Sequence, residues 1–322
     1  MNTREASPLR FLMLRLVVPA TLLAVVSSLS PGQEPVIGED LEGDVRRMEI
    51  HEKVLAGDMK EFQGRASRRE VLVFDEGKLS KRITFLPEDR YLWKSTFSYD
   101  ERGKLIGRSS YDEDGELKWR YEYDYDREGR LVREVSLDSR EEVEQVLVYE
   151  YVDGRLVEEV MHDGRDTIQW RKTYSYDDQQ RVQAWSMYYP DGTRIKKVRH
   201  SYDEQGRLVR EQHTNELGIV YHDIHYRFSG ASRQPSTITT YDGEGNLQRK
   251  ETYEYNRRGN VRLKQVVLPR EDYHELISHT YRYDHTGNWI RQRVTRYAVR
   301  EEGRELIQEK VIQRKIEYKG EQ

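Results

Sequence analysis

The feature that most constrains the fold of this chain is a tyrosine-rich motif that recurs through most of its 322 residues. The core of its clearest copy reads Tyr-x-Tyr-Asp-x-x-Gly-x-Leu, from Tyr123 to Leu131. Asp at the first turn position and Gly at the fourth are typical of a type I β-turn whose last residue is left-handed. We therefore predict a hairpin turn in each copy, with the structural turn residues Asp100, Gly103, Asp126, Gly129, Asp203, Gly206, Gly259, Asp284 and Gly287.

The copies are evenly spaced. The main turns follow aromatic residues 25 to 28 positions apart, namely Tyr99, Tyr125, Tyr151, Tyr176, Tyr202, Phe228, Tyr255 and Tyr283. Further turn signals fall midway between them, at 111–115, 162–164, 189–192, 215–218 and 241–245. A turn therefore arrives roughly every 13 residues, an interval that one strand of about eight or nine residues and one tight turn would fill.

The strands between the turns have two different faces. Aromatic residues two positions apart, such as Tyr174 with Tyr176, lie on one face of a strand, and the mostly charged residues between them lie on the other. Strands joined by tight turns are antiparallel, and the turns predict on the order of twenty strands. We expect an all-β fold, a long antiparallel meander of repeated hairpins that forms a curled sheet or shell, because open twisted sheets rarely exceed ~10 strands.

The chain begins with the layout of a secretory signal peptide, which we assign to residues 1–32. Arg4 and Arg10 lead into an apolar stretch, which Arg15 interrupts, and small residues follow it. The uninterrupted apolar part is shorter than the ~20 residues of a membrane-spanning helix, so we expect no integral membrane span after signal cleavage. Residues 33–42 are expected to form a flexible leader, and residues 43–322 a single β-repeat domain with its clearest repeats in 74–300. Residues 43–62 fit a short helix or the first strands, and we favour strands.

Composition narrows the classes of function. The protein has no Cys, which excludes disulfides, cysteine nucleophiles and a lipid-bearing cysteine. Its formal net charge is −4, and loss of residues 1–32 makes it more negative, so we expect no nucleic-acid partner. A charged fraction of 35% with a mean hydropathy of −0.95 would suggest disorder, but 23 regularly spaced tyrosines indicate a folded repeat.

The sequence contains no motif that identifies an active site, so we assign no catalytic, cofactor-binding or metal-binding residues. No Gly-x-Ser-x-Gly elbow and no phosphate-binding Gly-Lys-Ser/Thr loop occurs. The best metal candidate is His222-Asp223-Ile224-His225, but residues three apart on a strand point to opposite faces. The recurring aspartates are explained by the turns, although a glycosidase needs only two suitably placed carboxylates.

The tyrosines admit packing and ligand binding as alternative roles, because an aromatic ring can stack on sugars as well as on other rings. Their strict tie to the turns favours packing. Tyr188 and Tyr189 precede a half-period turn, and we single them out as candidate ligand-binding aromatics for a glycan or peptide.

The motif Tyr-x-Tyr-Asp-x-x-Gly-Arg-Leu resembles the signature of the RHS/YD-repeat proteins of bacterial surfaces and secreted toxins. The resemblance covers roughly residues 74–300 and implies a β-strand shell that encloses cargo, or cell-surface binding. This sequence departs from the large family members by its spacing near 26, its half-period turns and its short length. The turns at 151–154 and 188–192 also resemble, more weakly, the MORN-type repeats of antitoxin-like proteins.

We expect an exported, non-enzymatic binding or scaffold repeat protein of the bacterial cell envelope. It would be periplasmic, secreted or on the cell surface, it would contact a protein or glycan of the envelope, and it would need no cofactor. The alternatives are an envelope polysaccharide hydrolase and an immunity-like partner of a toxin.

Overall fold

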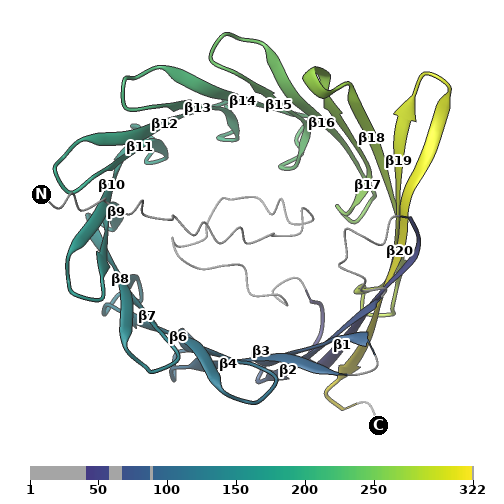
Figure 1. Ribbon diagram of the computed structural model, residues 1–322, viewed down its shortest axis with the longest axis horizontal. Helices are drawn as coiled ribbons and strands as arrows, with labels where there is room; N and C mark the ends of the chain where they lie inside the picture. Colours follow the sequence, from purple (N-terminus) through teal and green to yellow (C-terminus); the bar gives the residue numbers. More distant parts are fainter. Residues whose placement is uncertain (1–40, 58–66, 88–89, 321–322) are drawn as a thin grey trace, which may run out of the picture.

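The structure is a computed structural model that describes residues 41–57, 67–87 and 90–320. These residues form almost only β-strands, which confirms the predicted all-β class (Figure 1). The predicted signal peptide, 1–32, and residues 33–40 of the predicted leader lie outside the described residues. The strands are β1 (Val45–Gly57), β2 (Ser67–Asp75), β3 (Lys78–Phe85), β4 (Tyr91–Tyr99), β5 (Leu105–Tyr111), β6 (Leu117–Tyr125), β7 (Leu131–Leu137), β8 (Val143–Val152), β9 (Arg155–Asp163), β10 (Ile168–Tyr176), β11 (Val182–Tyr188), β12 (Arg194–Tyr202), β13 (Leu208–Thr214), β14 (Val220–Phe228), β15 (Pro235–Tyr241), β16 (Leu247–Tyr255), β17 (Val261–Leu268), β18 (Tyr273–Tyr283), β19 (Trp289–Arg300) and β20 (Gly303–Tyr318).

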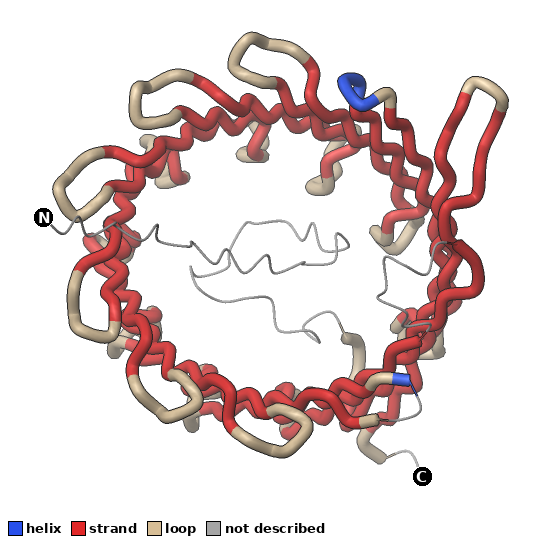
Figure 2. The backbone as a smooth tube through the Cα atoms, viewed as in Figure 1, coloured by secondary structure: helices blue, strands red, loops and turns tan. Residues whose placement is uncertain are grey.

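The strands close into a single barrel. Each strand pairs antiparallel with the next strand in the sequence, and β20 pairs with β1, so that the meander returns to its start (Figure 2). The closing pair is long, since it runs from Val45 opposite Tyr318 to Gly57 opposite Gln308. The predicted meander is therefore confirmed, and its curled sheet is a closed one.

Up-and-down topology gives the barrel two rims. One rim, which we call the main rim, holds the connections from even- to odd-numbered strands, including the turns at 100–104, 126–130 and 203–207. The other, the half-period rim, holds the connections from odd- to even-numbered strands, including 189–193, 215–219 and the 3₁₀ helix η3 (Pro269–Glu271; blue in Figure 2). The two turn families of the sequence therefore lie at opposite ends of the barrel.

The strands have a tyrosine face and a charged face. On β6 the tyrosine face carries Tyr121, Tyr123 and Tyr125, and the charged face carries Glu122 and Asp124. Most of the large buried side chains lie on the tyrosine face, where one cluster joins Tyr123, Leu131, Tyr149 and Leu156 across β6 to β9. Burial of these rings and aliphatic groups stabilises the sheet by roughly 25 cal/mol per Å² of apolar surface.

A second core cluster lies at the seam where the barrel closes. Met48 of β1 and Leu72 of β2 are fully buried there, with Tyr318 of β20 beside them. Leu41 packs against this cluster, and the backbone of Glu42 exchanges hydrogen bonds of 2.8 and 2.7 Å with the side-chain amide of Asn288. The last two residues of the predicted leader are therefore held against the barrel.

Residues 41–57, 67–87 and 90–320 include no helix with the length and apolar character needed to cross a bilayer.

Candidate functional site at the rim of the barrel

The turns of the main rim have the geometry that the sequence motif predicts. The glycines at the fourth position have φ angles of 76° to 80°, or 106° at Gly287, and their N–H groups donate to the carbonyl of the first turn residue at 2.9 to 3.3 Å. This is a type I turn followed by a left-handed residue, which gives a hairpin a three-residue loop. The main turn between β10 and β11 has Gln180 in the left-handed position, and Glu141 and Asp166 take that position in two turns of the half-period rim.

The turn aspartates hold the turns together. The Oδ1 atom of Asp126 accepts the backbone N–H of Arg130 at 2.8 Å, and its Oδ2 atom accepts Nε of the same arginine at 2.6 Å. Desolvation alone would raise the pKa of this carboxyl, but the backbone and guanidinium hydrogen bonds of Arg130 outweigh it, and the net pKa is lowered. The pKa of Asp203 is lowered by the same arrangement with Arg207. Turn carboxyls of this kind are held ionised, which opposes a role as general acids.

Most main turns also contact the turn one repeat earlier. In seven copies a tyrosine hydroxyl donates to the backbone carbonyl 20 residues earlier at 2.6 to 3.1 Å, as Tyr125 does to Leu105. The cation that follows the left-handed turn residue, which is Gln180 in one copy and glycine in the others, lies over the aromatic ring 21 residues later. The distances are 4.5 to 5.7 Å, from Lys78 over Tyr99 to Arg207 over Phe228. These contacts explain why the residues of the main turns are so similar from one copy to the next.

From its place directly after a turn glycine, the sequence predicts that Arg207 faces solvent, and this prediction is wrong. Its side chain is only 18% exposed, and it bonds Asp203 Oδ2 at 2.7 Å and the carbonyls of Gly230 and Ser232 at 2.7 and 3.0 Å. The recurrence of Lys or Arg directly after the turn glycine was a sequence signal for this role. What the sequence did not reveal is the ring one repeat away on which the cation lies.

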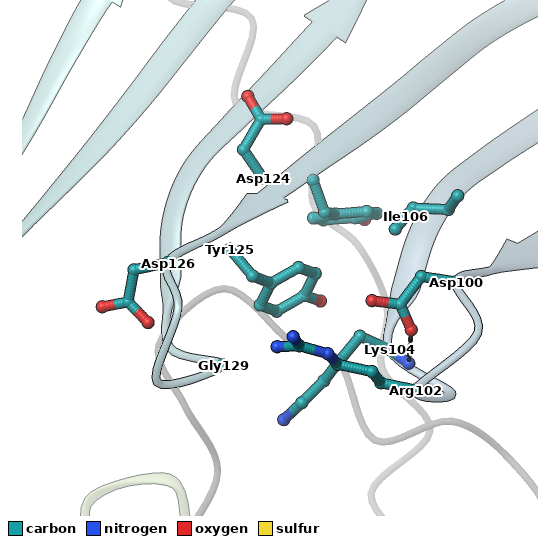
Figure 3. Close-up of a pocket in the computed structure, with 9 residues that line it drawn as sticks. Asp100, Arg102, Lys104, Ile106, Asp124, Tyr125, Asp126 and Gly129 are labelled. Atoms are coloured by element: carbon teal, nitrogen blue, oxygen red, sulfur yellow. Dashed lines mark hydrogen bonds between the residues drawn. The ribbon is translucent and has the colours of Figure 1, made fainter.

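Adjacent main turns enclose a groove of about 240 Å³, lined by residues that include Asp100, Asp126 and Gly129. Figure 3 shows the Tyr125 ring between the two turns, with the side chains of Arg102 and Lys104 beside it. The groove is the gap between consecutive copies of the repeat, and its lining residues are those that hold the turns. Three of the predicted turn residues, Asp100, Asp126 and Gly129, therefore lie together in this groove, where their role is structural.

The middle of the tyrosine face contains buried ion pairs. Glu159, which is 5% exposed, bonds the hydroxyl of Tyr174 and lies 3.4 Å from Nζ of Lys172. Burial lowers the pKa of Lys172, although Glu159 opposes that shift. Glu251 is held in the same way, by Lys264 and Arg249, each at 2.7 Å. These carboxylates are paired on neighbouring strands, which is what burial of a charge requires.

The histidine motif on β14 does not form a joint site. His222 lies on the tyrosine face near the ring of His213, and Asp223 lies on the charged face, where it pairs with His225 at 3.0 Å and with Arg210. Within the described part of the chain, no group of three or more His, Asp or Glu side chains is arranged to hold a metal ion.

The half-period rim exposes several large apolar side chains. Leu217 and Ile219, in the turn between β13 and β14, are 76% and 58% exposed, and Tyr189, in the turn between β11 and β12, is 51% exposed. The two turns are neighbours because β12 pairs with β13, and Arg194 Nη2 donates to the carbonyl of Glu216 at 3.4 Å. We call Tyr189, Leu217, Ile219 and Tyr221 the rim patch.

The two candidate ligand-binding tyrosines lie differently. Tyr188 ends β11, is half-buried and stands opposite Arg171 and Arg194, whereas Tyr189 is exposed in the turn and belongs to the rim patch. Sequence reasoning missed Leu217 and Ile219. Their signal was two aliphatic residues inside a turn, where the other copies have charged or small ones.

The geometry defines the protein as a closed antiparallel barrel of repeated hairpins. No protein-family model matches the chain, and no curated protein matches it significantly. Similar solved structures include a porin-like protein from Bacteroides uniformis, with a TM-score of 0.38 and 12% identity over 86% of this chain and 98% of that one. Another porin-like protein, from Bacteroides vulgatus, has a TM-score of 0.28 and 12% identity over 86% of this chain and 99% of that one.

The pore form of the Photorhabdus luminescens Tc holotoxin is also similar, with a TM-score of 0.38 and 16% identity over 76% of this chain. This chain spans only 14% of the toxin chain. At such low identities and TM-scores, these similarities assign neither a family nor an activity.

Proposed function

We propose that this chain is an exported, non-enzymatic binding protein of the bacterial cell envelope that docks a partner protein through the rim patch. The observation that carries the proposal is the exposure of Leu217 and Ile219, two aliphatic side chains in a turn where the repeat does not require them. Residues that recur in each copy serve the fold, and residues that differ are free to serve a ligand. Binding residues are often placed on loops that a rigid scaffold positions.

The chemistry of the rim patch favours a protein over a glycan. Sugar rings stack on aromatic faces, which Leu217 and Ile219 lack. Exposed aliphatic groups beside tyrosines match the apolar centre of a protein interface, which a polar margin surrounds. Arg194 and Glu216 supply such polar groups next to the patch.

The charged face supports an aqueous location, in the periplasm, at the cell surface or in the medium. On β6 this face presents Lys118, Arg120, Glu122 and Asp124 in succession, which is the pattern of a solvated surface. We further propose that the repeats are of the YD type, on the strength of the turn motif and of the tyrosine contacts between successive copies. A polysaccharide hydrolase is less well supported, because the carboxyls of Asp126 and Asp203 have lowered pKa values and the buried Glu251 is paired.

The test is capture of a partner from the protein's own cell envelope by the chain that starts near residue 33. We expect the wild type to retain one partner protein. Leu217→Ser or Ile219→Ser should reduce the captured amount of that partner about tenfold or more, since central apolar residues carry most of an interface's energy. Leu306→Ser is the matched control, because Leu306 is 44% exposed on the distant hairpin of β19 and β20. Equal capture by all variants, binding of glycans alone, or release of sugar from envelope polysaccharide would contradict the proposal.

A further inference from the structure

The seam of the barrel contains a basic cavity that is separate from the rim patch. It has a volume of about 370 Å³ and is lined by parts of β1, β2, β19 and β20 and by Leu86 and Pro87 after β3. These strands lie on the opposite side of the barrel from β12 and β13 (Figure 1). A volume of this size lies at the lower end of the range for small-molecule sites, roughly 300 to 1,000 Å³.

The strand register places four polar side chains of the cavity in one row. Arg291 stands opposite Gln313, Gln313 opposite His51, and His51 opposite Arg69. Neighbouring strands are ~4.8 Å apart, so the row extends for about 14 Å across the charged face. Such a row can donate several hydrogen bonds to a single extended ligand.

The charge of the cavity is opposite to that of the protein. Lys53, Arg68, Arg69 and Arg291 contribute positive charge, and Glu52 is the only carboxylate of the described lining, whereas the whole chain has a net charge of −4. Glu52 is engaged by Lys310 at 2.9 Å.

The cations of the cavity differ in the contacts that they already make with other side chains. Arg68 pairs with Glu70, and the Arg69 guanidinium lies 3.8 Å from the centre of the Phe85 ring. Lys53 and Arg291 form no ion pair with any residue in 41–57, 67–87 or 90–320. Two cations in one concave site, neither of them in an ion pair with a described residue, raise the local concentration of anions.

We propose that this cavity binds an oxyanion, with Arg291 and Lys53 as the principal ligands for a phosphoryl or sulfo group. A guanidinium presents paired N–H donors that match two oxygens of such a group, and the Lys53 ammonium adds a point charge. Gln313 and His51 lie between Arg291 and Arg69 in the row. The Gln313 amide is placed to hydrogen-bond a remaining oxygen, whereas His51 Nε2 lies 3.4 Å from Glu49 Oε2. The site does not depend on the proposed docking function, because none of its lining residues belongs to the rim patch.

The test is titration of the folded protein by calorimetry with inorganic phosphate, pyrophosphate and sulfate at constant ionic strength, and with acetate as the ionic control. We expect saturable binding of the oxyanions, tightest for pyrophosphate, and a loss of roughly tenfold with Arg291→Gln or Lys53→Gln, the usual effect of removing a charge-assisted hydrogen bond. Arg133→Gln is the matched control, because Arg133 is an exposed arginine of the charged face outside the cavity.

Comparison of phosphate with sulfate then identifies the group that the site prefers. No saturable binding, acetate binding equal to phosphate binding, or an equal loss with Arg133→Gln would overturn the proposal. Melting curves recorded without anion separate a loss of folding from a loss of binding, and Lys53→Gln serves if Arg291→Gln does not fold. Leu217→Ser should leave anion binding unchanged, so that failure of the docking proposal and of this one can be distinguished.

Discussion

The hydroxyl of Tyr125 donates a 2.8 Å hydrogen bond to the backbone carbonyl of Leu105, 20 residues earlier in the chain. The same bond recurs in other copies, where it attaches a main turn to the start of the strand that follows the previous main turn. Because these carbonyls lie beside the turns, the tyrosines fix the spacing of successive hairpins around the barrel. The repeat period therefore reflects a physical contact.

Loss and gain of this hydroxyl should change stability in opposite directions. Tyr125→Phe should reduce the free energy of unfolding by about 1 kcal/mol, the net value of a typical intramolecular hydrogen bond. Phe228 occupies the same place without a hydroxyl. Phe228→Tyr should raise stability by a few tenths to ~1 kcal/mol. Denaturant melts measure both, and a loss in both variants would show that the contact does not stabilise the barrel.

Substitution of a turn glycine should strain the backbone. Gly129→Val and Gly206→Val should each destabilise by roughly 1–3 kcal/mol, the cost of a sparsely populated conformation. A Cβ atom at either position would come no closer than 3.4 Å to a neighbour, so the effect measures backbone strain and not a clash. Gly259, which also has a positive φ, should behave alike. Urea or guanidinium melts decide the matter, with Arg127→Gln, at an exposed turn position, as the control.

The reverse change at Gln180 should stabilise the protein. Gln180 has a φ of 64°, a left-handed conformation that costs a non-glycine residue ~1 kcal/mol. Gln180→Gly should therefore raise the free energy of unfolding by up to ~1 kcal/mol, less part of that gain because glycine makes the unfolded chain more flexible. Asp178→Gly, in the same turn, should only destabilise. Thermal melts of both variants are the measurement. Equal melting temperatures for the two variants would contradict the prediction that Gln180 is strained.

Replacement of Arg207 should cost more than a typical surface substitution. Arg207→Gln removes hydrogen bonds to Asp203, Gly230 and Ser232 and the cation over the Phe228 ring. We expect a loss of ~1–3 kcal/mol, against less than ~0.5 kcal/mol for the exposed Arg127→Gln. Chemical denaturation of both variants is the measurement. Similar values for the two would mean that the Arg207 contacts contribute nothing.

Acid should weaken the barrel through His279. Burial, with Lys310 and Lys264 nearby, lowers the pKa of His279 from 6.5 to about 4. Between these two values the unfolded chain binds a proton that the folded chain does not, so stability falls as pH falls from 6.5 towards 4, by on the order of 3 kcal/mol. His279→Gln should flatten this part of the profile, whereas His225→Gln, at an exposed site, should leave it in place. A pH series of denaturant melts tests the prediction, and an unchanged slope in His279→Gln would refute it.

Export of the protein remains a prediction, which is based on its first 32 residues. N-terminal sequencing of protein recovered outside the cytoplasm should start near residue 33, because the apolar run ends in small residues that suit signal cleavage. Recovery of that protein with Met1 intact would count against a cleaved signal.

The sequence by itself determined the local structure of this protein. The Asp-x-x-Gly turns, the pairs of tyrosines two residues apart and the all-β meander follow from turn chemistry and from the two-residue period of a strand, which act over a few neighbouring residues. The tertiary structure decided the contacts that depend on position around the ring. The pairing of β1 with β20 joins residues more than 250 positions apart, and no local pattern encodes that register.

The residues of the candidate sites can also be separated into those that the sequence indicates and those that only the tertiary structure brings together. Tyr189 was visible in the sequence as an aromatic beside a turn. That its turn neighbours the turn of Leu217 follows from the pairing of β12 with β13. Arg207 was expected to face solvent because its ring partner lies one repeat away, on a different hairpin. The row from Arg291 to Arg69 exists only because the barrel closes and brings strands from the two ends of the chain together. Local interactions set each hairpin, whereas closure of the sheet sets which hairpins are neighbours.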